Sequence, residues 1–266
     1  MEQEKRLDCL LDYLKRDHTG KNDFEIPAGY TEKRTLFRAL VNVRPPRPVT
    51  ADFLKIQDAF LHEESRQKGI ITLAEIPPCP SNDRISLWRG DITRLAVDAI
   101  VNAANSEMRG CFVPGHHCID NAIHTAAGLQ LREECHLLME KQRHPEGTGG
   151  AKITKGYNLP AKHVIHTVGP IVQDSPTERQ HQELAGCYRS CLDLAVQNGL
   201  RSIAFCCIST GVFSFPKALA SKIAINVVRE CLKEGRKIER VIFNVFTDED
   251  YYHYSGILTD CQLKWL

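Results

Sequence analysis

From residue 85 onward, short apolar segments alternate along the chain with longer amphipathic segments. Three of the short segments are continuous apolar runs, typical of strands covered on both faces: Ala99-Ile100-Val101, Ile203-Ala204-Phe205 and Val241-Ile242-Phe243. Strands are predicted at residues 85–89, 99–102, 151–155, 163–168, 202–208 and 240–246, and helices at residues 119–142, 178–197, 216–234 and 249–262. This alternation favours an α/β fold, a three-layer α/β/α sandwich with a central mixed sheet.

The first 80 residues have a different pattern, in which amphipathic helical segments and proline-containing stretches follow one another. Helices are predicted at about residues 3–16, 33–42 and 51–68, and a proline-rich segment at residues 77–80 closes the region. Short helices of this kind are stable only when they lie against another surface. We therefore interpret residues 1–80 as a helical N-terminal extension packed on a core domain formed by residues 81–266.

The overall composition argues against several classes of partner. The net charge is +1, with 42% apolar and 25% charged residues, so no strong positive field favours nucleic acid. No run of about 18 apolar residues predicts a membrane span. The charged start of the chain also lacks the apolar segment of a secretory signal. We expect a cytoplasmic monomer with no membrane or nucleic-acid partner.

The chain has eleven cysteines, which are dispersed and odd in number. A cytosolic chain of this length does not depend on disulfides for its stability. Cys187 and Cys191 lie four residues apart on a predicted helix, and Cys206 and Cys207 lie within a predicted strand. We expect these four to be packing residues, because free cysteine behaves as a small apolar side chain.

Cys111 and Cys118 differ from the other cysteines because two histidines lie close to them. The segment Gly110-Cys111-Phe112-Val113-Pro114-Gly115-His116-His117-Cys118 contains the spacing Cys-x4-His-x-Cys. Thiolates and imidazole suit Zn²⁺, and three ligands with an open fourth position are the pattern of a catalytic zinc. Two other interpretations stay open. Both cysteines could pack in the core, or they could belong to a structural site completed by His117, His124 or a distant cysteine.

Polar or glycine-containing segments follow three of the predicted strands, where α/β sheets bind their ligands. Asp91 and its neighbouring amides could bind an adenine ring, and Asn105 offers a donor and an acceptor to ribose hydroxyls. Residues 209–213 offer amides and hydroxyls to a diphosphate. Taken singly, each segment is equally typical of a turn or an ordinary strand-to-helix connection.

Six segments follow one another in a recognisable order between residues 82 and 262. They are Gly90-Asp91-Ile92-Thr93, the Val-Asp-Ala-Ile-Val-Asn-Ala-Ala-Asn of residues 97–105, the Asp-Asn-Ala-Ile-His-Thr-Ala-Ala-Gly of residues 120–128, the Ala-Lys-Ile-Thr-Lys-Gly-Tyr of residues 151–157, the His-Val-Ile-His-Thr-Val-Gly-Pro of residues 163–170, and residues 202–211. In this order the segments resemble the macrodomain family. The resemblance implies a macrodomain-like fold that binds ADP-ribose beyond the carboxyl ends of the strands.

The same resemblance implies a role for individual residues. Asp91 and the backbone of Ile92 would hold the adenine, Asn244 would lie near the adenosine, and Asn105 would lie at the distal ribose. The residues that would hold the diphosphate are Ser209, Thr210, Gly211, Val212 and Phe213.

The loop before Asp120 departs from the usual family pattern. Hydrolytic macrodomains usually carry a run of glycines that ends in Asp, whereas here two cysteines and two histidines replace most of the glycines. Such a loop, together with a helical N-terminal extension, resembles the zinc-dependent macrodomain subgroup. That resemblance implies a Zn²⁺ cofactor held by Cys111, His116 and Cys118, with Asp120 and Asn105 as catalytic residues.

The function implied is a zinc-dependent protein-ADP-ribose hydrolase. It would remove mono-ADP-ribose from a modified protein side chain, at an Asp or Glu ester, and release ADP-ribose. Two alternatives remain open. The chain could be an ADP-ribose reader without catalysis, since lost glycines can mean lost chemistry, or it could deacylate small O-acyl-ADP-ribose esters.

Overall fold

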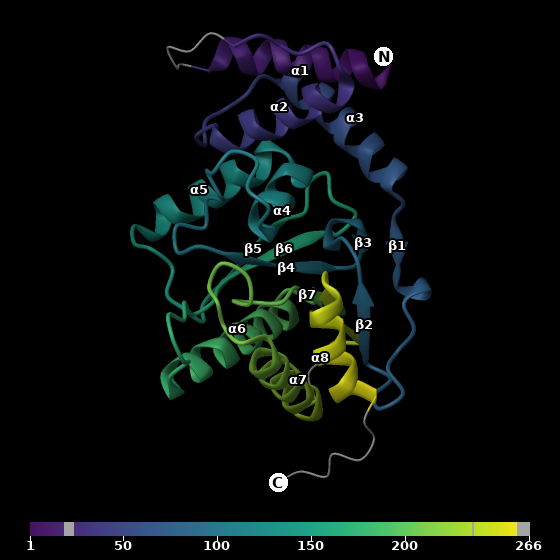
Figure 1. Ribbon diagram of the computed structural model, residues 1–266, viewed down its shortest axis with the longest axis vertical. Helices are drawn as coiled ribbons and strands as arrows, with labels where there is room; N and C mark the ends of the chain where they lie inside the picture. The colour runs from purple at the N-terminus through teal and green to yellow at the C-terminus, as the bar shows by residue number, and fades with distance from the viewer. Residues whose placement is uncertain (19–23, 236, 260–266) are drawn as a thin grey trace.

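A six-stranded mixed sheet forms the centre of the molecule (Figure 1). The computed structural model describes residues 1–18, 24–235 and 237–259. The strands are β2 (Ile85–Arg89), β4 (Ala99–Ala104), β5 (Ala151–Lys155), β6 (His163–Val168), β7 (Ser202–Phe205) and β8 (Arg240–Val245). Their order is β2-β8-β7-β4-β6-β5, and every pair is parallel except β5 with β6. The predicted central mixed sheet is therefore confirmed.

Helices cover both faces of this sheet. The helices are α4 (Ile119–Ala127), α5 (Leu129–Gln142), α6 (Glu178–Gln197), α7 (Lys217–Lys233) and α8 (Asp248–Thr259). Helices α4 and α5 pack on one face, against β4 and β5, while α6, α7 and α8 pack together on the other (Figure 1). The apolar runs of β4, β7 and β8 are buried between the two helical layers, which gives the predicted three-layer sandwich.

Several predicted boundaries were wrong. The helix predicted at residues 119–142 is two helices, because Gly128 has a φ of 93° and a Cβ there would lie 2.6 Å from Gln57 Nε2. The strand predicted at residues 202–208 ends at Phe205, so Cys206 and Cys207 lie beyond it, although Cys206 is buried as expected. The second helix begins at Tyr30, three residues early. Residues 260–262 of the last predicted helix lie outside the described residues.

The N-terminal extension is formed by α1 (Gln3–Asp17), α2 (Tyr30–Val43) and α3 (Ala51–Lys68). Their apolar faces form a hydrophobic cluster separate from the main core, and Leu129 of α5 belongs to it. Gln57 adds a polar contact, because its Oε1 accepts from the Leu129 amide at 3.0 Å. The extension therefore lies against the α4–α5 layer, at the top of Figure 1.

Short elements connect the extension to the sheet. Strand β1 (Ile71–Thr72) pairs in parallel with β3 (Leu95–Ala96), and the 3-10 turns η1 (Leu73–Glu75) and η2 (Ile92–Arg94) flank them. Across the described ranges, every helix is too short or too polar to cross a membrane.

Asp98, directly before β4, ties together the starts of three strands. Its carboxylate accepts from the backbone amides of Arg201 and Ser202 at 2.9 and 3.0 Å, and from Lys162 Nζ at 2.7 Å. Its backbone carbonyl accepts from the His163 amide. Burial alone would raise the pKa of Asp98, but the hydrogen bonds from Lys162 and the two amides outweigh it and hold that pKa below its ordinary value.

The Asp98→Asn variant should therefore be less stable than the unmodified protein by about 1–2 kcal/mol at pH 7. A carboxylate whose pKa is lowered by folding stabilises the protein above its unfolded pKa, and this contribution is lost as the pH falls through the folded pKa. The difference between the two proteins should shrink as the pH drops below about 4. Urea unfolding across this range measures it, with exposed Asp174→Asn as the control. A difference that is independent of pH would contradict the assignment.

Candidate active site

The predicted ligand-binding loops meet at one edge of the sheet. Strands β2, β8, β7 and β4 are neighbours and run parallel, so their carboxyl ends coincide. Asp91, Asn105 and Ser209 follow three of these strands, and Asn244 is the fifth residue of β8. The structure therefore brings the predicted site residues to one edge, as parallel α/β sheets generally do.

Asn244 and Asp91 belong to the same small arrangement. Asn244 Nδ2 donates to the Gly90 carbonyl at 2.9 Å, which supports the turn that carries Asp91. Asp91 Oδ1 accepts from the Thr93 amide and hydroxyl, and thereby caps η2, while Ile92 is buried. Sequence reasoning placed Asn244 near the adenosine, and the structure adds that it holds the Asp91 turn. Adenine binding by these residues stays a prediction.

The loop of residues 209–213 presents backbone donors. Throughout the described ranges, the amides of Ser209, Gly211, Val212 and Phe213 have no hydrogen-bond acceptor, and the buried Ser209 Oγ also has no partner. Ser209 has a φ of 65°, a left-handed backbone conformation that turns the chain sharply at the start of this loop. Successive free amides of this kind form a concave anion-binding nest. The Thr210 hydroxyl instead donates to the Cys207 carbonyl, so its predicted contact with a diphosphate competes with a contact inside the loop.

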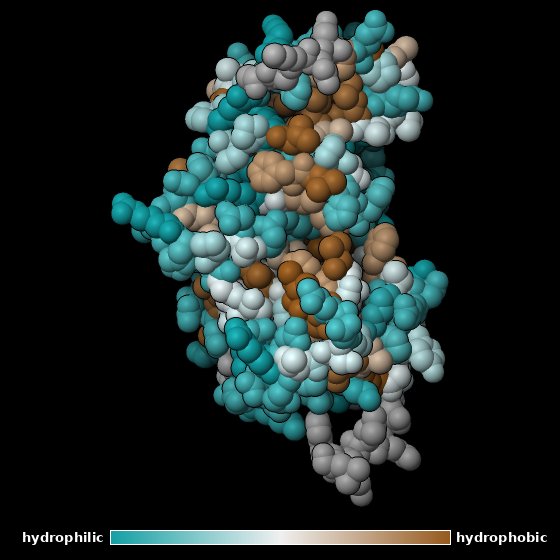
Figure 2. All heavy atoms as spheres, turned by 60° about the vertical axis from the view of Figure 1, so that its left-hand side comes forward, coloured by the Kyte–Doolittle hydropathy of each residue, from teal (hydrophilic) through white to brown (hydrophobic). Residues whose placement is uncertain are grey.

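Several loops also expose large apolar side chains. Val212 is 71% exposed, and Phe112 and Val113 are exposed in the loop that follows β4. The Arg132 guanidinium lies over the Phe112 ring at 4.4 Å from its centre. Figure 2 shows several hydrophobic patches among hydrophilic atoms on the face of the molecule that it brings forward. Exposed apolar groups of this kind are common around ligand-binding and protein-binding sites.

Cys111, His116 and Cys118 converge, as their spacing predicted. One ligand atom from each residue lies within 4.8 Å of the others, and Cys111 Sγ lies 3.6 Å from His116 Nδ1. All three are half-buried. The group of ligand atoms contains neither His117 nor His124 among the described residues, so the structural-site alternative that used them is not favoured.

The chemistry of these three residues fits a zinc ion. Burial raises the pKa of Cys118 to about 11, and the nearby Cys111 and Asp120 add to the effect, while the amide of Asn121 opposes it. The Cys118 thiol therefore resists ionisation unless a cation is bound beside it. Two thiolates and one imidazole are ligands that Zn²⁺ prefers, and a set of three leaves one position for water or substrate.

Asp120 lies at the start of α4, two residues beyond Cys118, and is 4% exposed. Its Oδ1 accepts from Asn102 Nδ2 at 2.8 Å. Burial raises the pKa of Asp120 to about 6, although the Asn102 hydrogen bond and the positive charge of Arg132 oppose the rise. A carboxylate with a pKa this close to neutrality is suited to accept a proton during catalysis.

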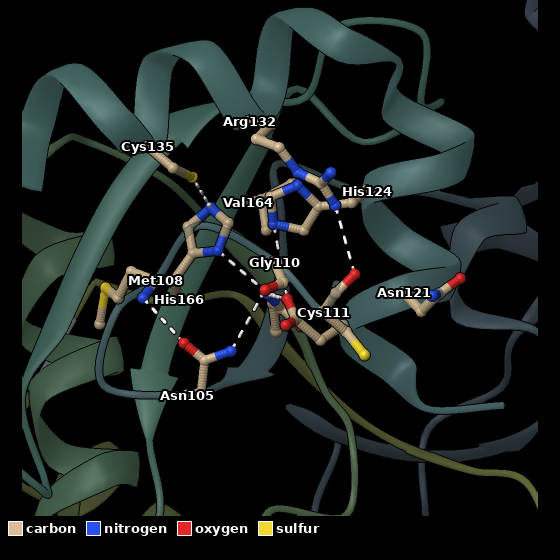
Figure 3. Close-up of polar contacts among 12 residues, drawn as sticks. Asn105, Met108, Gly110, Cys111, Asn121, His124, Arg132, Cys135, Val164 and His166 are labelled. Carbon is tan, nitrogen blue, oxygen red and sulfur yellow. Dashed lines mark hydrogen bonds and ion pairs between the residues drawn. The ribbon is translucent and has the colours of Figure 1, made fainter. Parts of the chain in front are cut away.

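Two buried histidines, His124 and His166, lie close to Asp120 and Asn102, and Figure 3 labels both rings. His166 Nδ1 lies 3.1 Å from Asn102 Nδ2, and its Nε2 lies 2.9 Å from Thr154 Oγ1. His124 Nε2 lies 3.4 Å from Asp120 Oδ1 but forms no hydrogen bond with it. Burial lowers the pKa of His166 to about 3 and holds the pKa of His124 well below its ordinary value. Both rings are therefore neutral at pH 7 and leave Asp120 without an ionised imidazole partner.

His124, His166 and Cys135 also bring three possible ligand atoms within 4.8 Å of one another. Both nitrogens of His166 already have polar neighbours, and the charge of Arg132 opposes a cation beside His124. We assign no metal to this group. Sequence reasoning did not predict that Asn102 binds Asp120 or that His166 lies beside Asn102, although each is a polar residue within an apolar strand, and the register pairs them across β4 and β6.

Asn105 shapes the loop that carries the three candidate metal ligands. Its Nδ2 donates to the Gly110 carbonyl at 3.2 Å, and its Oδ1 accepts from the amides of Glu107 and Met108 (Figure 3). Gly110 has a φ of 85°, and a Cβ there would lie 3.1 Å from the His124 ring. The loop can lie against α4 and α5 only because this residue has no side chain.

Comparison with known proteins finds one matching family and several relatives that match nearly the whole chain. The Macro domain family matches residues 101–224. The chain is 48% identical to a protein-ADP-ribose hydrolase of Treponema medium, over 97% of this chain and 100% of that protein. It is 47% identical to a protein of the same name from Staphylococcus aureus, over 94% of each chain.

A solved structure agrees with these relatives. The Trypanosoma brucei macrodomain in complex with ADP-ribose superposes with a TM-score of 0.65 at 33% identity, covering 87% of this chain and 96% of that one. The fold, the order of the site loops and the 48% identity over nearly the whole chain lead to one conclusion. This chain belongs to the macro domain family.

Proposed function

We propose that this chain is a protein-ADP-ribose hydrolase that uses one Zn²⁺ ion, held by Cys111, His116 and Cys118. The observation that carries the proposal is that these three side chains converge next to a buried carboxylate. The last of them, Cys118, lies two residues before that carboxylate, Asp120. Relatives that match nearly the whole chain are named protein-ADP-ribose hydrolases, which supports the same activity here.

ADP-ribose would lie across the carboxyl ends of the strands. The turn of Asp91 and Ile92, supported by Asn244, would receive the adenine. The free amides around Gly211, together with Ser209 Oγ, would bind the diphosphate, because unpaired N–H groups attract anions. The distal ribose would then lie at Asn105, beside the metal-binding loop. The modified side chain, which joins the distal ribose to the protein substrate, would extend out of the site at this end.

Asp120 would act as the proton acceptor. Asn102 fixes its orientation by a 2.8 Å hydrogen bond, and the neutral His124 beside it keeps the carboxylate free of an ion pair. Bound Zn²⁺ would supply Lewis acidity, by lowering the pKa of a water molecule or by polarising a carbonyl or hydroxyl oxygen of the substrate. The linkage proposed is an ester between ribose and Asp or Glu, whose acyl carbon is open to attack by water.

Metal analysis of the purified protein should give about one zinc per chain. Removing the zinc with a chelator should abolish release of ADP-ribose from a mono-ADP-ribosylated carboxylate. Cys118→Ala should have the same effect, because the two remaining ligands hold zinc weakly. Cys9→Ala is the matched control, since Cys9 is exposed on α1. Full activity in metal-free protein would rule out the zinc mechanism. Binding of ADP-ribose without hydrolysis, or hydrolysis of small O-acyl esters only, would favour the two alternative functions.

Asp120→Asn should slow release of ADP-ribose by about 10²- to 10⁴-fold, because the amide accepts no proton. Its oxygen still accepts from Asn102, so the site keeps its shape and the Kd for ADP-ribose should change little. Single-turnover release and calorimetric binding measure the two effects separately. The exposed Asp52→Asn, in the first turn of α3, serves as the control. An unchanged release rate would exclude Asp120 as the proton acceptor.

A further inference from the structure

The three metal ligands lie on a segment without regular secondary structure. Between the end of β4 at Ala104 and the start of α4 at Ile119, the backbone forms only turns and bends. The positions of Cys111, His116 and Cys118 therefore depend on the side chains that hold this backbone from outside. Two of those side chains come from α2, in the N-terminal extension.

Arg38 and Asn42 of α2 bind the loop directly, between its first and last metal ligands. Arg38 Nη2 donates to the His116 carbonyl at 2.9 Å. Asn42 Oδ1 accepts from the Gly115 amide at 3.2 Å. Two adjacent residues of the loop are thus held by side chains one turn apart on a single helix.

The same two side chains also bind α4, which carries Asp120. Arg38 Nε donates to Asn121 Oδ1 at 3.1 Å, and Asn42 Nδ2 donates to Thr125 Oγ1 at 3.2 Å. Asn121 Nδ2 in turn donates to the Val113 carbonyl of the loop. Helix α2 therefore connects the ligand-bearing loop with the helix that carries the proposed proton acceptor.

Arg132 of α5 adds a further connection between α2 and the loop. It is 3% exposed, and its Nη1 donates to the carbonyls of Val41, Asn42 and Arg44 at the end of α2, at 2.7 to 2.9 Å. Its Nη2 donates to the Cys111 carbonyl at 3.4 Å. One guanidinium thus joins the end of α2 to Cys111, the first proposed metal ligand. Figure 3 shows Arg132 beside His124.

We infer that α2 of the N-terminal extension is a positioning element of the metal site, acting through Arg38 and Asn42. This inference rests on the proposed function, because it assumes that the loop holds zinc. Neither side chain touches a ligand atom. Each instead holds the backbone next to His116, which reduces the conformational entropy that the loop loses when its three donor atoms converge on the ion.

Three variants of α2 separate positioning from charge and from general stability. Arg38→Met removes both hydrogen bonds but keeps the apolar stem. Arg38→Lys keeps the charge but lacks the planar fork that binds His116 and Asn121 together. Arg34→Met is the matched control, because Arg34 lies one turn earlier and pairs with Glu64 inside the extension.

Zinc affinity, measured on the full chain by competition with a chelator, is the readout, together with the thiolate-to-metal absorption band after cobalt(II) substitution. Arg38→Met and Asn42→Ala should each weaken zinc binding by about 10- to 100-fold, as loss of groups that orient metal ligands generally does. Arg38→Lys should be impaired as well. Arg34→Met should lower the melting temperature but leave zinc affinity and the cobalt spectrum unchanged.

Two results would overturn the inference about α2 without affecting the proposed function. One is zinc affinity in Arg38→Met and Asn42→Ala equal to that of the unmodified protein. The other is an equal loss in Arg34→Met, which would mean that general stability governs the site. If Arg38→Met fails to fold, Arg38→Lys and Asn42→Ala still give the comparison. If the unmodified protein binds neither zinc nor cobalt, the proposed function fails and the inference fails with it.

Discussion

Parallel pairing of β2, β8, β7 and β4 brings the carboxyl ends of four strands to one edge of the sheet. Every residue proposed to contact ADP-ribose lies on one of these strands or in the loop that follows it. The pairing is stabilised by burial of both faces, because apolar side chains of the strands pack against helices above and below. Asp98 holds the starts of β4, β6 and β7 together. These starts lie at the edge of the sheet opposite the site, so Asp98 helps to fix how the strands that lead to the site are aligned.

The electrostatics of the site follow from burial around Asp120. A buried carboxylate would ordinarily be paired with a cation, but the two nearest imidazoles are neutral and Arg132 donates to backbone carbonyls of α2. Asn102 supplies the only hydrogen bond to the Asp120 carboxylate within the described part of the chain. The carboxylate therefore keeps a pKa near neutrality while remaining next to the half-buried cysteines.

The N-terminal extension has its own hydrophobic cluster, yet its polar contacts are directed at the site. Arg38 and Asn42 project from α2 towards the loop that carries Cys111, His116 and Cys118, whereas Arg34 of the same helix pairs within the extension. This loop needs an external scaffold, because its own backbone forms no ladder of hydrogen bonds. The extension and the altered loop are in this sense one structural unit.

Sequence patterns alone located the six strands of the central sheet, since a continuous apolar run such as Val241-Ile242-Phe243 is stable only inside a covered sheet. They also predicted that Cys111, His116 and Cys118 converge, because the three residues lie within eight positions and one turn brings them together. Only the tertiary structure decided the break at Gly128, where Gln57 of a distant helix occupies the space that a side chain would need. The same holds for Asn102, His166 and Arg38. Their roles depend on partners 18 to 83 residues away, and local periodicity carries no information about contacts at that separation.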